Sequence, residues 1–178
     1  VAAITERAMR GELDFNTALA ERVHLLKGLP EHTLDAVLRT KITLTHGAAN
    51  LIAAAKSRGV HTYLLSGGFT FFTGALSQSL GMTGHFANEL EIVDGHLTGR
   101  TLGPIVNRQR KAELLRELAA KHAIPLTNTV AAGDGANDMD MLSLSGMGIA
   151  FCAKPALVEA SASAIFVRDL RLVQELIF

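Results

Sequence analysis

Short apolar segments alternate with helical segments from residue 43 onward, and this alternation constrains the fold more than any other feature. Four short apolar runs predict strands at 60–65, 129–132, 147–151 and 164–167. The intervening segments have helical periodicity, which predicts helices at 48–58, 71–80, 108–122, 138–144, 156–161 and 170–176. This order is typical of an α/β fold with a parallel sheet and helices on both of its faces.

Two segments depart from this alternation. Residues 88–100 contain two alternating stretches around Asp94-Gly95, which predicts a β-hairpin with a two-residue turn. The first 40 residues have only helical periodicity, so we expect three short helices there, the second capped by Asn16. We therefore expect a small helical subdomain at residues 1–42 and an α/β core at residues 43–178.

Charge and composition limit the classes of partner. The chain has 17 basic and 17 acidic residues, so it carries no overall field that would attract nucleic acid or an anionic membrane. No apolar stretch is long enough to span a bilayer, and the first residues do not resemble a signal peptide. The single Cys152, expected to be a small buried side chain, is compatible with a reducing compartment. We expect a cytoplasmic monomer or homodimer that binds small molecules.

In open sheets of this type, ligands bind at the carboxyl ends of the strands. The sequence YLLSGGF at 63–69 leaves a strand through Ser66, Gly67 and Gly68 before the next helix. The hydroxyl group and the accessible backbone amides there suit a phosphate oxyanion. Local capping of the following helix is the alternative interpretation.

A second strand end carries several oxygen-bearing side chains. Gly133 is followed by Asp134, Asn137 and Asp138 within one tight loop. Crowded carboxylates repel each other, and a bound cation relieves this repulsion, so Mg²⁺ held by Asp134 is expected. The alternative is a surface turn in which Asp138 caps the next helix.

A basic cluster opens the helix expected at 108–122. Lys111 is the member that could point toward the strand ends, where a lysine would balance the charge of a phosphate. A solvated basic helix face is the alternative interpretation.

These segments occur in the order SGGF, a lysine opening a helix, and GDGAND. In this order they resemble motifs of the haloacid dehalogenase-like (HAD) phosphatases. The segments SGGFTFF, FANELEIVDGHLTG, QRKAELL and VAAGDGANDMDML are similar to the phosphoserine phosphatase family across most of the chain. The resemblance implies a HAD-like Rossmannoid parallel sheet with a β-hairpin insertion, and a small α-helical cap formed here by residues 1–42.

The resemblance also implies roles for individual residues. Arg22 would bind a substrate carboxylate, and Met9 and Phe15 would lie near the ligand as apolar cap residues. Without the resemblance, Arg22 would be interpreted as a solvated residue and the other two as core packing. In the core, Lys111 and Asp138 would be catalytic, with Asn137 at the substrate and Asp134 at Mg²⁺.

One motif of the family is absent from the sequence. No Asp-x-Asp-x-Thr segment occurs among the 178 residues. In the family this segment ends the first strand and supplies the aspartate that attacks phosphorus. We therefore expect that strand to lie upstream of Val1 and the chain alone to be inactive.

The function that the resemblance implies is Mg²⁺-dependent hydrolysis of O-phosphoserine to serine and phosphate, the last step of serine biosynthesis. Two alternatives stay open. One is a HAD phosphatase for another small phosphomonoester, and the other is a phosphate- or metal-binding fragment without turnover.

Overall fold

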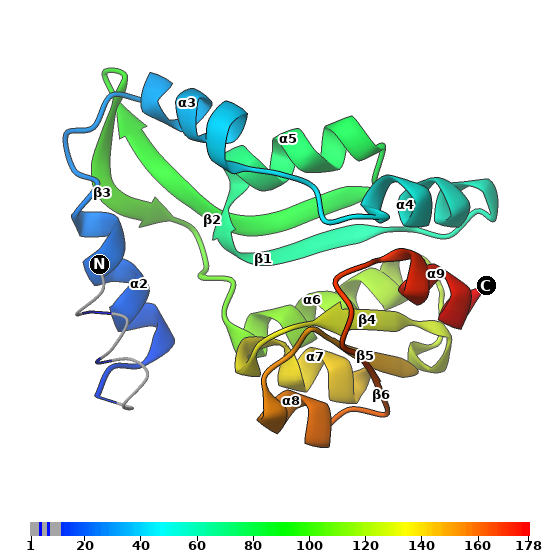
Figure 1. Ribbon diagram of the computed structural model, residues 1–178. Helices are drawn as coiled ribbons and strands as arrows, with labels where there is room; N and C mark the ends of the chain where they lie inside the picture. The colour runs from blue at the N-terminus through cyan, green and yellow to red at the C-terminus, as the bar shows by residue number, and fades with distance from the viewer. Residues whose placement is uncertain (1–3, 5–6, 8–11) are drawn as a thin grey trace.

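The computed structural model describes Ile4, Arg7 and residues 12–178 (Figure 1). Its first sheet has the order β1 (Tyr63–Phe69), β2 (Gly84–Val93) and β3 (His96–Leu102). β2 pairs in parallel with β1 and antiparallel with β3. The predicted hairpin is present, and Asp94 and Gly95 have the positive φ angles of 50° and 72° that its turn requires.

The second sheet contains β4 (Val130–Gly133), β5 (Met147–Phe151) and β6 (Ser163–Ile165), all parallel. β1 lies above β4 in Figure 1, but no ladder joins these strands, so both present a free edge within the described part of the chain. The expected single sheet is thus divided into two three-stranded sheets.

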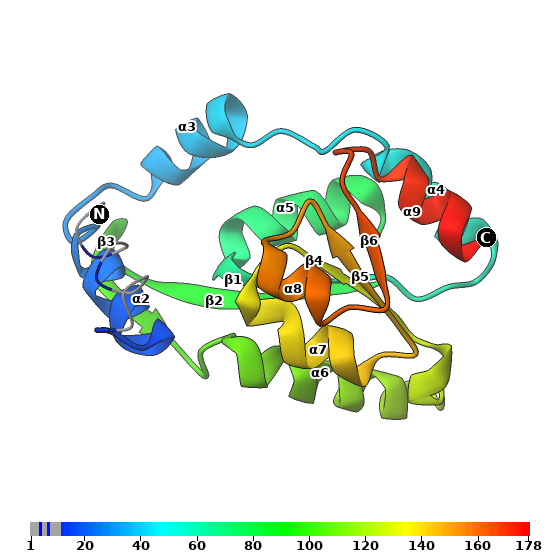
Figure 2. The ribbon, with the colours of Figure 1, turned by 60° about the horizontal axis from the view of Figure 1, so that its bottom comes forward.

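Helices cover the two sheets. Figure 1 shows α4 and α5 beside the first sheet, α6 behind the second sheet, and α7 and α8 below it, while α9 lies next to α4 in Figure 1 and Figure 2. The helices following the cap region are α4 (Ala48–Ser57), α5 (Thr70–Leu80), α6 (Arg108–Lys121), α7 (Met139–Leu144), α8 (Pro155–Glu159) and α9 (Arg171–Ile177), with short 3₁₀ turns η1 (Leu126–Asn128) and η2 (Ala136–Asp138). These bounds lie within two residues of the predicted ones.

The first helices pack on the hairpin. α2 (Phe15–His24) and α3 (His32–Lys41) contribute apolar side chains to one cluster with β2 and β3. The buried members of this cluster are Leu19, Val23, Leu34, Leu90 and Leu97. The first predicted helix falls largely outside the described residues.

The N-cap of α2 corrects one expectation. Asp14, rather than Asn16, caps the helix, and its Oδ1 accepts hydrogen bonds from the backbone N–H groups of Asn16 and Thr17 at 2.8 and 3.0 Å. Asn16 lies inside the first turn. Aspartate and asparagine are about equally good caps, so the sequence alone did not distinguish these two positions.

Asp169 connects the start of α9 to the loop before α4. It accepts a hydrogen bond from Arg171 N at 3.0 Å, and Arg171 Nη2 lies 2.6 Å from Asp169 Oδ2. His46 Nε2 lies 3.9 Å from the same carboxylate, and His46 O accepts from Leu170 N at 2.8 Å. Asp169 therefore helps to hold the C-terminal helix against the core.

The Asp169 carboxylate predicts an acid dependence of stability. The hydrogen bonds from Arg171 lower the pKa of Asp169 from 3.8 to about 2. A lowered pKa stabilises the fold above pH 3.8, and this contribution is lost as the pH falls toward 2. We expect Asp169→Asn to reduce the slope of unfolding free energy against pH in that window, measured by urea denaturation. An unchanged slope would contradict this role.

Candidate active site

The free edges of β1 and β4 flank a pocket of about 370 Å³. It lies at the carboxyl ends of both strands, where the sequence predicted a ligand site. Six of the predicted site residues line it: Ser66, Gly67, Lys111, Asp134, Asn137 and Asp138. Segments separated by more than 60 residues in the chain therefore contribute to one concave surface.

The SGGF segment is part of β1, although the predicted strand ended at Leu65. Gly68 N donates a hydrogen bond to Ser66 Oγ at 3.0 Å, which fixes the position of this hydroxyl group. A β-carbon on Gly67 would lie 3.0 Å from Phe15 Cζ, so glycine permits close approach of the helical region. β1 continues through this segment because Phe69 pairs with Asn88 of β2, and the Asn88 side chain donates hydrogen bonds to the carbonyl groups of Gly67 and Gly68.

The acidic loop is built around Asp138. A β-carbon on Gly133 would lie only 2.4 Å from Asp138 Cβ, so only glycine fits where β4 ends. Asp138 Oδ2 accepts hydrogen bonds from the backbone N–H groups of Asp134 and Gly135 at 3.2 and 3.3 Å. Asp138 thereby fixes the shape of the loop that carries Asp134.

Lys111 and Asp138 form a buried ion pair. Lys111 Nζ lies 2.6 Å from Asp138 Oδ1, and the two side chains are 5% and 7% exposed. The alternative of a solvated basic face does not hold for Lys111. It does hold for Arg108, which pairs with Asp140 at the surface.

Asp134 differs from Asp138 in having an exposed side chain. Its carboxylate has no hydrogen-bond or ion-pair partner among the described residues, and it faces the pocket together with Asn137. Within residues 12–178, no three His, Cys, Asp or Glu side chains converge as a metal cluster. Asp134 fits Mg²⁺, which usually takes one or two protein carboxylates and completes its shell with water and phosphate oxygens.

Four predicted residues do not line this pocket. Phe15 approaches it indirectly through Gly67, and Gly68 follows Gly67 within β1. Arg22 donates from Nε to Ala18 O at 3.1 Å, and it has no acidic partner in the described part of the chain. Met9 lies outside the described residues.

Two features were missed or misjudged from the sequence. Arg168 also lines the pocket. It follows strand β6, so the expectation that ligands bind at the carboxyl ends of the strands could have identified it. Cys152 was expected to be buried but is exposed. It has a φ angle of 48° directly after β5, and this left-handed turn accompanies the exposure of its side chain.

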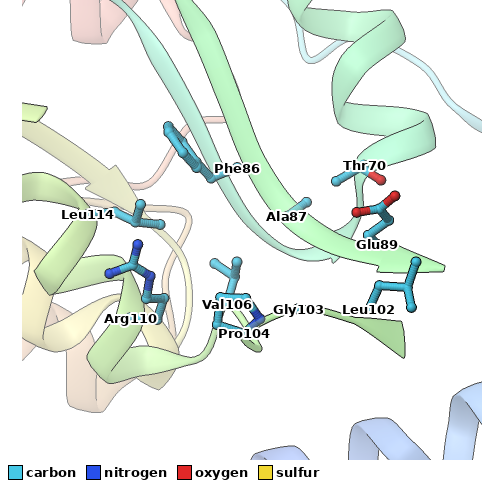
Figure 3. Close-up of a pocket in the computed structure, with 10 residues that line it drawn as sticks. All are labelled: Thr70, Phe86, Ala87, Glu89, Leu102, Gly103, Pro104, Val106, Arg110 and Leu114. Carbon is cyan, nitrogen blue, oxygen red and sulfur yellow. The ribbon is translucent and has the colours of Figure 1, made fainter. Parts of the chain in front are cut away.

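A second pocket, of about 200 Å³, lies between β2 and α6 (Figure 3). Phe86 and Leu114 approach each other at one end of it, beside Arg110. Arg110 is already paired with Glu113 and Glu117 at 3.3 and 2.5 Å. We therefore regard the pocket between β1 and β4 as the candidate active site.

Comparison with known proteins places the chain in a family. The model of the haloacid dehalogenase-like hydrolase family matches residues 2–143. The chain belongs to this family. It is 51% identical over 173 residues to a phosphoserine phosphatase of Streptomyces coelicolor, covering 97% of this chain and 42% of the relative. A phosphoserine phosphatase of Archaeoglobus fulgidus is 46% identical over 170 residues, covering 96% and 49%.

Solved HAD structures agree with the fold. A structure described as a phospho-aspartyl intermediate analogue of phosphoserine phosphatase superposes with a TM-score of 0.91 and 41% identity, covering 99% of this chain and 84% of that one. The resemblance to phosphoserine phosphatases and the HAD-like fold are thereby confirmed. The chain spans less than half the length of the two curated relatives above. No helix in the described residues has the length and apolarity needed to cross a membrane.

Proposed function

We propose that the chain carries the phosphate-, metal- and substrate-binding residues of a phosphoserine phosphatase. The reaction is Mg²⁺-dependent hydrolysis of O-phosphoserine to serine and phosphate, the last step of serine biosynthesis. The observation that supports this proposal best is the convergence of Ser66, Lys111 and Asp134 on one pocket at the strand ends. This pocket offers the Ser66 hydroxyl group and the Lys111 ammonium group to a phosphate, and the free carboxylate of Asp134 to a metal ion.

Each residue of the pocket has a proposed part. Ser66 and the amides of Gly67 and Gly68 would bind phosphate oxygens. Lys111, fixed by Asp138 at 2.6 Å, would balance the charge on the phosphate. Asn137 would orient the bound group beside Asp134.

Asp134 would hold Mg²⁺. When bound, the ion would polarise the phosphate and reduce the repulsion between its negative charge and an attacking oxygen. The exposure of Asp134 leaves room for the waters that Mg²⁺ retains.

The nucleophile is proposed to lie on a strand preceding Val1. The sequence contains no Asp-x-Asp-x-Thr segment, and the free edges of β1 and β4 flank the pocket. A strand placed there would bring aspartates at its carboxyl end to the same edge as Ser66 and Asp134. We therefore propose that the 178-residue chain alone does not turn over phosphoserine. The lack of the segment also favours a binding fragment without activity. Phosphate release by the chain joined to an Asp-x-Asp-x-Thr strand distinguishes the two, because a binding fragment would stay inactive.

We also propose that residues 1–42 act as a cap over a core of residues 43–178. Phe15 supports this division, since it approaches Gly67 of the SGGF segment. This segment, residues 66–69, is called the phosphate loop below. In this cap Arg22 would bind the substrate carboxylate, because its terminal guanidinium nitrogens have no protein acceptor among the described residues. A phosphate ester without a carboxylate would not need Arg22.

This difference makes the substrate testable. Arg22→Ala is expected to weaken O-phosphoserine binding by about 10- to 100-fold, because a hydrogen bond between charged groups is lost. Its affinity for inorganic phosphate should stay unchanged, since phosphate has no carboxylate. Isothermal titration of both ligands checks this, with the exposed Arg39→Ala as a control of equal charge. Equal affinities of the Arg22→Ala and unmodified proteins for O-phosphoserine would contradict the substrate assignment.

A further inference from the structure

Asn88 is the most deeply buried polar side chain of the described residues, at 1% exposed. It lies on β2, directly opposite Phe69 of β1. Figure 1 shows these two strands side by side, with β1 at the edge of the sheet. A buried amide of this kind must find hydrogen-bond partners, and its partners lie in the phosphate loop.

The register between β1 and β2 changes at this loop. Leu65 pairs with Phe86, but Phe69 pairs with Asn88, so β1 advances by four residues while β2 advances by two. The two additional residues form a bulge, which takes backbone groups out of the ladder. Carbonyl groups buried in this way need other donors.

The side chain of Asn88 supplies those donors. Its Nδ2 group donates to Gly67 O at 2.9 Å and to Gly68 O at 3.2 Å. Among the described residues no peptide bond is cis, so the N–H group following each carbonyl points the opposite way. The N–H groups of Gly68 and Phe69 are therefore directed away from Asn88. Gly68 N–H indeed meets Ser66 Oγ, a pocket-lining group, at 3.0 Å.

The other end of the amide connects the loop to α6. Asn88 Oδ1 accepts a hydrogen bond from Val106 N at 2.8 Å, and Val106 is itself buried. The next residue, Asn107, caps α6 through its side chain, and its carbonyl accepts from Lys111 N at 3.0 Å. One side chain thus joins the phosphate loop to the first turn of the helix that carries Lys111.

We propose that Asn88 is a positioning residue for phosphate recognition. By binding the carbonyl groups of Gly67 and Gly68, it directs Gly68 N–H to Ser66 Oγ, holds Ser66 and Gly67 at the pocket, and sets their distance from Lys111. This role rests on the proposed phosphatase function. Asn88 itself does not touch the substrate.

The test is phosphate binding by the 178-residue protein. Inorganic phosphate is titrated while the amide signals of Gly67 and Gly68 are followed by NMR. Asn88→Ala is expected to weaken binding by about tenfold or more, because two donors to a charged ligand lose their orientation. The control Ser77→Ala removes another buried polar side chain, which is 5% exposed and lies on α5. It should change stability without changing phosphate affinity, as a purely structural residue would.

A second variant retains the shape of the side chain. Asn88→Asp keeps an acceptor for Val106 N, but an ionised carboxylate cannot donate to the two glycine carbonyls. It should therefore lose phosphate affinity as Asn88→Ala does, even if the alanine variant does not fold. Unmodified affinity in either folded variant would overturn the role of Asn88.

The unmodified protein provides a test that needs no variant. Bound phosphate should slow hydrogen exchange at the amides of Gly67 and Gly68. Binding that leaves both amides unaffected would overturn the role of Asn88 while retaining a phosphate site. Absence of any phosphate binding by the unmodified protein would instead overturn the proposed phosphate site, and the role of Asn88 with it.

Discussion

Replacing Lys111 with methionine is expected to lower the free energy of unfolding by about 3–5 kcal/mol, because it leaves the Asp138 carboxylate buried without its counter-ion. The Asp138 side chain is only 7% exposed, so water cannot replace the lost ammonium group without opening the site. Its remaining donors are two backbone N–H groups at 3.2 and 3.3 Å. These bonds are long and do not neutralise the charge.

Urea denaturation at neutral pH measures this effect. Arg108→Met is the matched control, since it breaks the ion pair with Asp140 at the surface, where such pairs contribute about 0–1 kcal/mol. The double variant Lys111→Met with Asp138→Leu should recover much of the loss, because apolar pairs can replace buried ion pairs. Equal destabilisation by Lys111→Met and Arg108→Met would contradict the buried pair.

Joining the chain to an N-terminal strand that ends in Asp-x-Asp-x-Thr is expected to create phosphoserine phosphatase activity. The strand would pair with the free edges of β1 and β4, which now expose apolar positions such as Val130, 44% exposed. Its first aspartate would attack phosphorus, and its second would protonate the leaving serine oxygen and then activate water. The same pairing should raise the stability of the protein.

The helices and most strands could be predicted because local periodicity determines them. The predicted helix at 108–122 matches α6, since its apolar side chains recur at helical spacing on one face. The same helical spacing led to the expectation that Lys111 could point toward the strand ends. The predicted strand ended too early at Leu65, because Ser-Gly-Gly is typical of a loop. Phe69 pairs with Asn88 of β2, and the Asn88 side chain, 20 and 21 residues away, donates to the carbonyl groups of Gly68 and Gly67, so these residues stay in the strand.

The pairing of polar groups across elements could not be predicted in this way. The sequence placed Lys111 and Asp138 near the strand ends, but it did not show that they form a buried pair. Asn88 was missed because it lies in an alternating strand segment, where a single polar residue is expected to face solvent. Its partners become visible only when β1, β2 and the segment before α6 are assembled.

Phosphate release from O-phosphoserine is the measurement that tests the central proposal most directly. The 178-residue protein should release no more phosphate than buffer. The chain joined to the Asp-x-Asp-x-Thr strand should turn over at about 1 per second or faster. This activity should require Mg²⁺ and be lost in Asp134→Asn, but it should persist in Asp140→Asn. Turnover by the 178-residue protein alone, or none by the lengthened chain, would contradict the proposal.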